Sequence, residues 1–159
     1  MFAEGEKLVT QIRKEFADLE GPPRITLSVA RGLDDYWEER KELARLQRHH
    51  VHWMDVSKDE MEHYHDTWVF MDCEAFRFYL PAFMAAELES DKVIHNHPPA
   101  WVHSAFFKAD AEQVACFTAG QKRCVREFLE LICSSLSHPD DRASFREEIV
   151  VPWRGLLVG

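Results

Sequence analysis

Histidines form the clusters of side chains in this chain whose chemistry most suggests a site. His95 and His97 are two residues apart, and His103 follows six residues later. Side chains two apart in an extended segment point the same way, so these three histidines could bind zinc or a similar ion. The alternative is a plain surface loop, because the segment carries no carboxylate and Pro98 and Pro99 follow at once.

The other histidines suggest structural roles. His63 and His65 would diverge by about 200° on a helix, so they cannot share a metal ion unless the helix breaks. His65 falls on an apolar stripe, which predicts a core histidine bonded to a backbone carbonyl. His49, His50 and His52 lie where a helix is expected to end, a place at which the helix dipole favours positive charge.

Sequence motifs of catalysis are missing. The chain has no G-x-S-x-G turn, no phosphate-binding P-loop, no dinucleotide fingerprint and no H-E-x-x-H. Carboxylates are plentiful, but nothing in the sequence selects a pair for acid–base catalysis. We therefore favour a non-enzymatic protein and expect no cofactor.

Acidic residues are concentrated between positions 55 and 74, where seven carboxylates accompany one lysine and give a net charge of −6. Such a run is either a solvated face or a docking surface for a basic protein, such as a toxin bound by an immunity-like or regulatory partner. In the second case binding depends on salt, and the candidate docking residues are Asp55, Asp59, Glu60, Glu62 and Asp66.

Length and composition describe one soluble domain spanning residues 1–159, with 46% hydrophobic and 30% charged residues. The net charge of −9 argues against a nucleic-acid binder, which needs a basic stripe. No apolar run reaches the roughly 18 residues of a membrane span, and the acidic start does not resemble a secretory signal. We expect a cytoplasmic protein whose four cysteines are all thiols.

Apolar spacing predicts the first helices. A stripe of Leu8, Ile12, Phe16 and Leu19 predicts a helix over 4–20. We interpret 24–32 as an extended segment rather than a short strand. Asp34 and Asp35 are expected to cap a second helix that reaches Arg48 and buries three apolar residues, Trp37, Leu43 and Leu46.

Capping residues predict the later helices. Ser57 and Glu60 form one predicted capping box, and Asp72 opens a long helix in which Pro81 predicts a kink. Residues 91–117 are expected to be irregular, and a second capping box at 118–121 begins another helix. One short helix after Pro139 should end near residue 149, with Trp153 as an anchor. The fold class is mainly α, a compact single-domain bundle of about five to six helices with irregular loops and room for one short strand or hairpin.

Three segments resemble a widespread bacterial family of small proteins of unknown function. They are WMDVSKDEMEHYHDTWVFMDCEAFRFYLPAFM (53–84), FTAGQKRCVREFLELI (117–132) and ITLSVARGLDDYW (25–37). The family shares an "eaFryYLPAfl" helix and a following "ft-x-x-Q" helix start that leads to "v-x-x-FL". The resemblance implies a shared, mostly helical fold. It implies no activity, and no catalytic residue is carried over.

Overall fold

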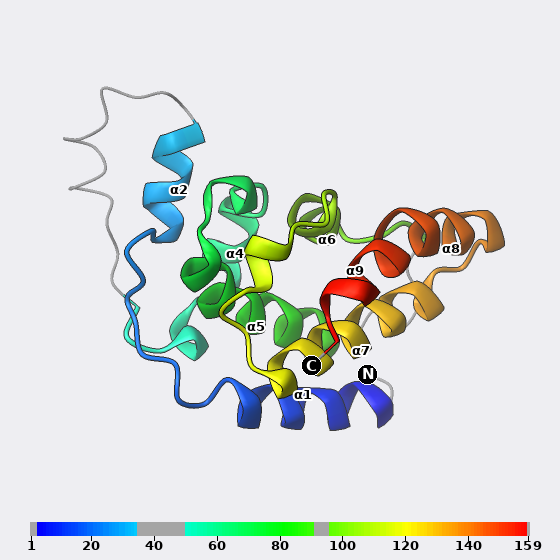
Figure 1. Cartoon of the computed structure of the whole chain (residues 1–159), viewed down its shortest axis with the longest axis horizontal. Helices are drawn as coiled ribbons and strands as arrows, with labels where there is room; N and C mark the ends of the chain where they lie inside the picture. Colours follow the sequence, from blue (N-terminus) through cyan, green and yellow to red (C-terminus); the bar gives the residue numbers. More distant parts are fainter. Residues whose placement is uncertain (1–2, 35–49, 91–95, 159) are drawn as a thin grey trace.

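Helix α5 lies near the middle of the molecule, and α1 runs along the lower edge, below α5 and α7 (Figure 1). The computed structural model describes residues 3–34, 50–90 and 96–158. Helix α1 (Ala3–Glu15) packs against both α5 (Cys73–Glu89) and α7 (Ala119–Ser135). The described residues form helices and turns without a β-strand, which confirms the expected mainly α fold.

Helix α5 begins where Asp72 predicts a cap, because the Asp72 Oδ1 atom accepts a hydrogen bond from the Ala75 amide at 2.9 Å. The helix continues through Pro81 to Glu89. It lies among other elements on most of its sides, so it is apolar nearly all round, as expected for a central helix. Its buried side chains include Phe76, Tyr79, Leu80, Phe83 and Met84.

Helix α7 begins with the predicted capping box. Thr118 Oγ1 accepts from the Gln121 amide and Gln121 Oε1 accepts from the Thr118 amide, each at 3.1 Å. The Gln121 side-chain amide also donates to the Glu15 carbonyl at 3.0 Å, which ties the start of α7 to the end of α1. Helix α1 ends at Glu15, whereas the prediction placed its end at residue 20. Phe16 is nevertheless buried, in the turn that follows the helix.

The segment predicted to be extended at 24–32 is instead largely helical, which corrects that interpretation. Helix α2 (Leu27–Asp34) begins after Thr26, whose hydroxyl accepts from the Val29 amide at 3.3 Å. Leu27 and Ala30 are buried three residues apart, so the apolar pattern has a helical period as well as an alternating one. Asp34 is the last residue of α2, and the predicted helix from Asp35 to Arg48 lies outside the described residues.

Gly21 marks a close approach between two chain segments. Its amide donates to the Val51 carbonyl at 2.9 Å, and the Gly21–Pro22 peptide bond is cis. A Cβ atom at this position would overlap the His50 carbonyl oxygen and the Phe78 ring. Only glycine fits here without displacing its neighbours.

Helix α4 (Lys58–His63) has the predicted N-terminus, because Ser57 Oγ accepts from the Glu60 amide at 3.2 Å. The helical spacing of Met61, Tyr64, His65 and Trp68 predicts a longer helix, but α4 ends at His63. Trp68 lies beyond it in a 3₁₀ turn, η2 (Trp68–Phe70), where its indole donates to the His65 carbonyl at 3.0 Å. A further 3₁₀ turn, η1 (Trp53–Asp55), precedes α4 and is anchored by the Trp53 indole bond to the Phe16 carbonyl.

Residues 96–117 are more regular than predicted. They contain helix α6 (Ala100–Phe106) and a 3₁₀ turn, η3 (Ala111–Val114). Val102 and Phe106 are buried four residues apart, and Pro99 stands at the helix start, where a missing amide costs nothing. Because α6 has only 7 residues, its apolar spacing is too short to predict a helix.

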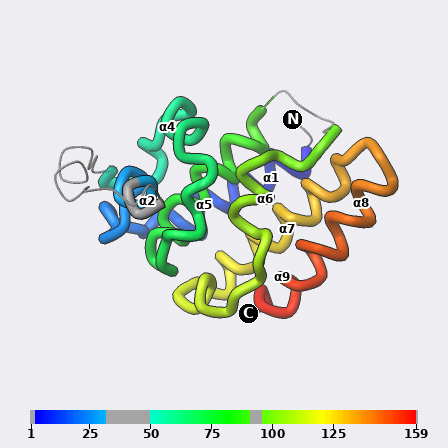
Figure 2. Tube along the Cα trace, turned by 90° about the horizontal axis from the view of Figure 1, so that it is seen from above, coloured from blue at the N-terminus to red at the C-terminus, as the bar shows by residue number. Residues whose placement is uncertain are grey.

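The C-terminal region has more helix than the single short one predicted. Helix α8 (Pro139–Phe145), a π-helical segment, η4 (Arg146–Val150), and helix α9 (Val151–Leu156) follow one another. They lie along α7 at the end of the molecule opposite α2 (Figure 2). Trp153 is fully buried, which confirms it as an anchor.

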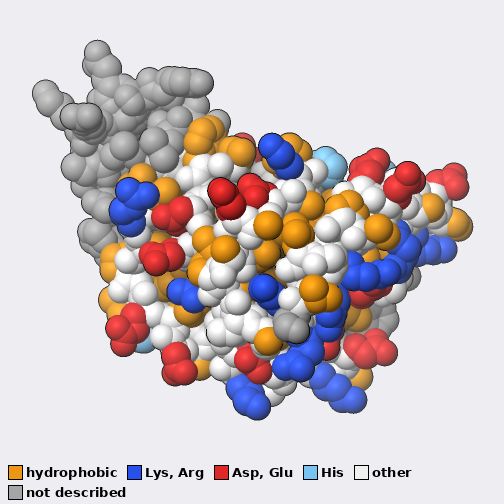
Figure 3. All heavy atoms as spheres, in the orientation of Figure 1, with side chains coloured by type: hydrophobic (Ala, Val, Ile, Leu, Met, Phe, Trp, Pro, Cys, Tyr) orange, Lys and Arg blue, Asp and Glu red, His pale blue; other side chains and the backbone are white. Residues whose placement is uncertain are grey.

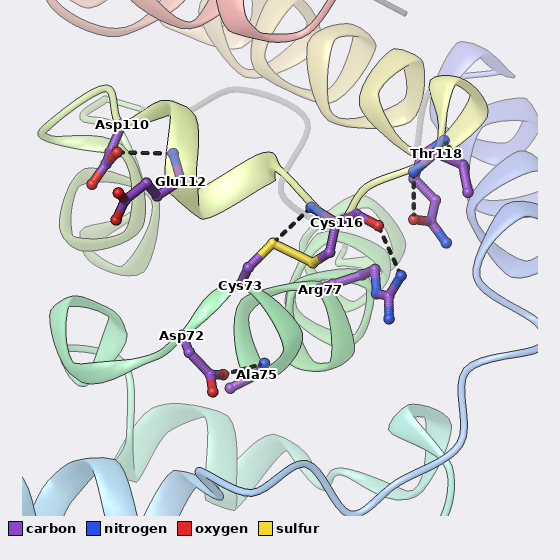
Figure 4. Close-up of a disulfide and its surroundings, with 9 residues drawn as sticks. Asp72, Cys73, Ala75, Arg77, Asp110, Glu112, Cys116 and Thr118 are labelled. Atoms are coloured by element: carbon purple, nitrogen blue, oxygen red, sulfur yellow. Dashed lines mark hydrogen bonds between the residues drawn. A yellow bond between two sulfur atoms is a disulfide. The ribbon is translucent and has the colours of Figure 1, made fainter.

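Cys73 and Cys116 form a disulfide, so the expectation of four thiols is wrong for this pair (Figure 4). The two residues are 43 positions apart, and it is the packing of η3 against α5 that brings them together. No local spacing in the sequence signals such a pair. The other two cysteines, Cys124 and Cys133, are buried thiols as predicted.

Candidate binding groove

The predicted three-histidine site remains a prediction. His95 lies outside the described residues, while His97 and His103 are exposed. The nearest acidic partner of His97 is Asp141, with 3.9 Å between Nδ1 and Oδ2. In residues 3–34, 50–90 and 96–158 no three His, Cys, Asp or Glu side chains come close enough to hold a metal ion.

Two of the five predicted docking carboxylates hold the fold together. Glu60 Oε2 lies 2.6 Å from His50 Nε2, and the two side chains are 17% and 10% exposed. Asp66 Oδ1 lies 2.6 Å from an Arg31 guanidinium nitrogen, which also donates to the His63 carbonyl. These contacts fasten α4 and the turn after it to residue 50 and to α2.

The other three acidic residues, Asp55, Asp59 and Glu62, are exposed. Of these, Glu62 borders a groove that α4, α5 and α6 enclose, with a volume of about 470 Å³. The surface of the groove is mainly apolar. Its lining residues are Lys58, Met61, Glu62, His65, Phe83, Ala86, Glu87, Ser90, Ala100 and Trp101.

Trp101 forms a rigid wall of this groove. Its indole N–H donates to Glu87 Oε1 at 3.2 Å. Its ring is packed against Phe83, Trp68 and Phe128, with ring-centre distances of 5.3, 5.9 and 5.5 Å. Aromatic contacts at these distances stabilise the position of the ring, so α6 presents a preformed apolar surface to the groove.

His65 borders the same groove, which corrects its predicted place in the core. The side chain is exposed, although its Nδ1 atom does lie 2.8 Å from the Glu62 carbonyl, as the core interpretation required. Since a carbonyl only accepts, Nδ1 carries the proton and Nε2 is the acceptor when the ring is neutral.

A family of unknown function, DUF6714, has a model that matches residues 4–153. The chain belongs to this family. The match confirms the expected membership of a family of unknown function, and no curated protein or solved structure matched the chain. In the part of this DUF6714 protein that the structure describes, none of the helices combines the length and apolar character needed to cross a membrane.

Lysine and arginine side chains form a band on the α7–α9 region of the DUF6714 protein, with acidic side chains beside it (Figure 3). Arg146 and Arg154 both contact the Glu130 carboxylate, at 3.0 and 2.9 Å. The hydrogen bond from Arg146, with a second from Arg154, lowers the pKa of Glu130 although partial burial opposes the shift. Basic and acidic side chains are thus paired in this region.

Sequence reasoning missed Phe83, Glu87 and Trp101 as groove residues. Phe83 and Glu87 lie four apart on α5, so both project towards the same side of that helix. Trp101 fell in a segment predicted to be irregular. The acidic run includes Glu62 of α4, but nothing in the sequence showed that α4 faces α6 across the end of α5.

Proposed function

We propose that this DUF6714 protein is a non-enzymatic, cytoplasmic module that binds a basic segment of a partner protein in the groove between α4, α5 and α6. In its most specific form the partner is a toxin whose cationic site is covered by an immunity-like or regulatory protein. The observation that carries the proposal is the placement of two carboxylates, Glu62 and Glu87, beside a preformed apolar wall.

The groove suits a side chain that is apolar along its stem and positive at its tip. Arginine and lysine have this character, because their methylene groups pack on apolar surface while the charged head stays near water or an anion. Met61, Phe83 and Ala86 offer surface for such a stem. The volume of about 470 Å³ accepts one or two side chains rather than a folded domain.

The charge around the groove favours a cation. Glu62 and Glu87 outnumber Lys58, which is the one lysine or arginine in the lining. Asp55 and Asp59, exposed on η1 and α4, extend the negative field beyond the groove. A field of this kind speeds the encounter with a basic partner and disfavours acidic ones.

The test uses a partner purified after capture at low salt from the native host. Its dissociation constant is measured by calorimetry for the wild type, for the double variant Glu62→Gln/Glu87→Gln, and for a control, Glu74→Gln/Glu112→Gln, whose exposed carboxylates lie outside the groove lining. We expect the groove variant to weaken binding by about tenfold or more and the control to change it little.

Salt provides the second arm of the test. Binding of the wild type should weaken between about 50 and 300 mM sodium chloride, because exposed charges are screened within a Debye length. The groove variant should show a smaller dependence on salt. A partner that binds both forms equally, or whose affinity does not respond to salt, would show that the groove is not its docking site.

A further inference from the structure

We infer that Cys73 and Cys116 form a thiol–disulfide exchange site whose co-reactants are low-molecular-weight thiols and their disulfides. Both residues are half-buried, in contrast to the fully enclosed Cys124 and Cys133. The bridge joins the first turn of α5 to the chain between η3 and α7 (Figure 4). The inference is independent of the proposed docking function.

The two cysteines are held together by contacts other than the sulfur–sulfur bond. An Arg77 guanidinium nitrogen donates to the Cys116 carbonyl at 2.8 Å. The next residue, Phe117, is buried and packs on Phe76 of α5 with 5.8 Å between ring centres. Cys116 should therefore stay beside α5 after reduction, which gives the thiols a high effective concentration and makes oxidation reversible.

The surroundings favour negative charge on the sulfur of Cys73. This residue is the first of α5, where the helix dipole stabilises an anion. The Cys116 amide donates to Cys73 Sγ at 3.1 Å. The neighbouring Asp72 carboxylate opposes this effect, but it is already bonded to the Ala75 amide and lies 3.7 Å from an Arg24 nitrogen.

The exchange proceeds in two balanced steps. A glutathione-type thiolate attacks Cys116 Sγ, a mixed disulfide forms there, and the Cys73–Cys116 bond breaks with Cys73 leaving as the thiolate. A second thiolate attacks the small-molecule sulfur of the mixed disulfide and releases Cys116 as a thiolate. The protein gains two electrons and, once both thiolates are protonated, two protons, while two thiols become one small-molecule disulfide. Oxidation is the reverse.

The experiment equilibrates the native, full-length protein in buffers of reduced and oxidised glutathione, followed by alkylation and mass spectrometry of the cysteine peptides. We expect the dithiol and disulfide forms to interconvert from both directions without loss of helical circular dichroism. Arg77→Met should lower the ratio of the squared concentration of reduced glutathione to that of oxidised glutathione at half-oxidation by about tenfold, because it loosens Cys116. The control Arg123→Met, an exposed position on α7, should not change that ratio.

Three results would overturn the inference. One is a disulfide that excess reduced glutathione leaves intact under native conditions. Another is reduction that unfolds the protein and cannot be reversed. The third is a half-oxidation ratio that Arg77→Met does not change. If Arg77→Met does not fold, Arg77→Lys replaces it, and the wild-type titration still decides whether exchange is reversible.

Discussion

The indole N–H of Trp153 donates a hydrogen bond to the Phe106 carbonyl oxygen, with 2.8 Å between nitrogen and oxygen. The two rings also meet edge to face at 5.2 Å. This contact joins α9 to the end of α6, and α6 carries Trp101 of the groove. The C-terminal helix thus supports a groove wall that it does not itself form.

Replacing Trp153 with phenylalanine should lower the free energy of unfolding by about 2–4 kcal/mol. The change leaves the buried Phe106 carbonyl without its donor and opens a cavity beside Phe76. Urea unfolding followed by circular dichroism measures the effect. Val151→Ala, at an exposed position of the same helix, is the matched control and should stay within about 0.5 kcal/mol of the wild type. Equal stability of the two variants would contradict the anchoring role.

Glu60→Gln should destabilise the protein by about 1–3 kcal/mol, because it weakens a largely buried contact with His50. Asp66→Asn should cost less, about 0.2–1 kcal/mol, since its contact with Arg31 is partly exposed. Asp55→Asn serves as the control, because this carboxylate is exposed and has no ion pair among the described residues. Thermal unfolding would rank the three variants, and an Asp55 variant as unstable as the Glu60 variant would refute this division of roles.

The protein should lose stability above pH 9. Burial raises the pKa of the Cys124 thiol from 9.0 to about 12, with Glu15 and Glu127 adding to the shift. Unfolded chains release this proton above pH 9 while the folded protein keeps it, so stability is complete below pH 9 and falls as the pH rises towards 12. For this one proton, the free energy of unfolding falls by at most about 1.4 kcal/mol per pH unit.

Burial also raises the pKa of the Tyr79 hydroxyl, so Tyr79 likewise lowers the free energy of unfolding as the pH rises. The Cys124→Ala variant separates the two groups. Its free energy of unfolding should fall less steeply between pH 9 and pH 11 than that of the wild type. Parallel curves for the two proteins would show that Cys124 does not contribute.

Thr118→Ala should lower the free energy of unfolding by about 0.5–2 kcal/mol, because the variant loses the side-chain acceptor at the start of α7. Thr10→Ala is a matched control on α1, where the exposed hydroxyl only bonds back to the Glu6 carbonyl within the same helix. Chemical unfolding of both variants tests the prediction. A control that loses as much stability as Thr118→Ala would argue against a special role for the capping box.

Local chemistry made several elements predictable. Ser57, Asp72 and Thr118 each accept a hydrogen bond from an amide three residues further on, so the side chain and its partner lie within one short stretch of sequence. Such a contact needs no distant residue. The same applies to the buried face of α7, whose residues repeat every three or four positions.

Two short helices, α2 and α6, were not predicted. Helices α2 and α6 have 8 and 7 residues. Helices of this length are unstable in isolation and form because tertiary packing stabilises them. Ile25, Leu27 and Val29 fit both an alternating and a helical pattern, and only the packing of α2 against η2 decides between the two.

The sequence by itself determined the helical class, the starts of α4, α5 and α7, and the acidic character of α4, because each depends on residues within about one or two turns of one another. Tertiary structure alone decided that Cys73 bonds to Cys116 and that Glu60 contacts His50. It also decided that Glu62, Glu87 and Trp101 line one groove. These are contacts between residues at least ten positions apart in the chain. Their partners are selected by how the helices pack, which the spacing of residues along one helix does not specify.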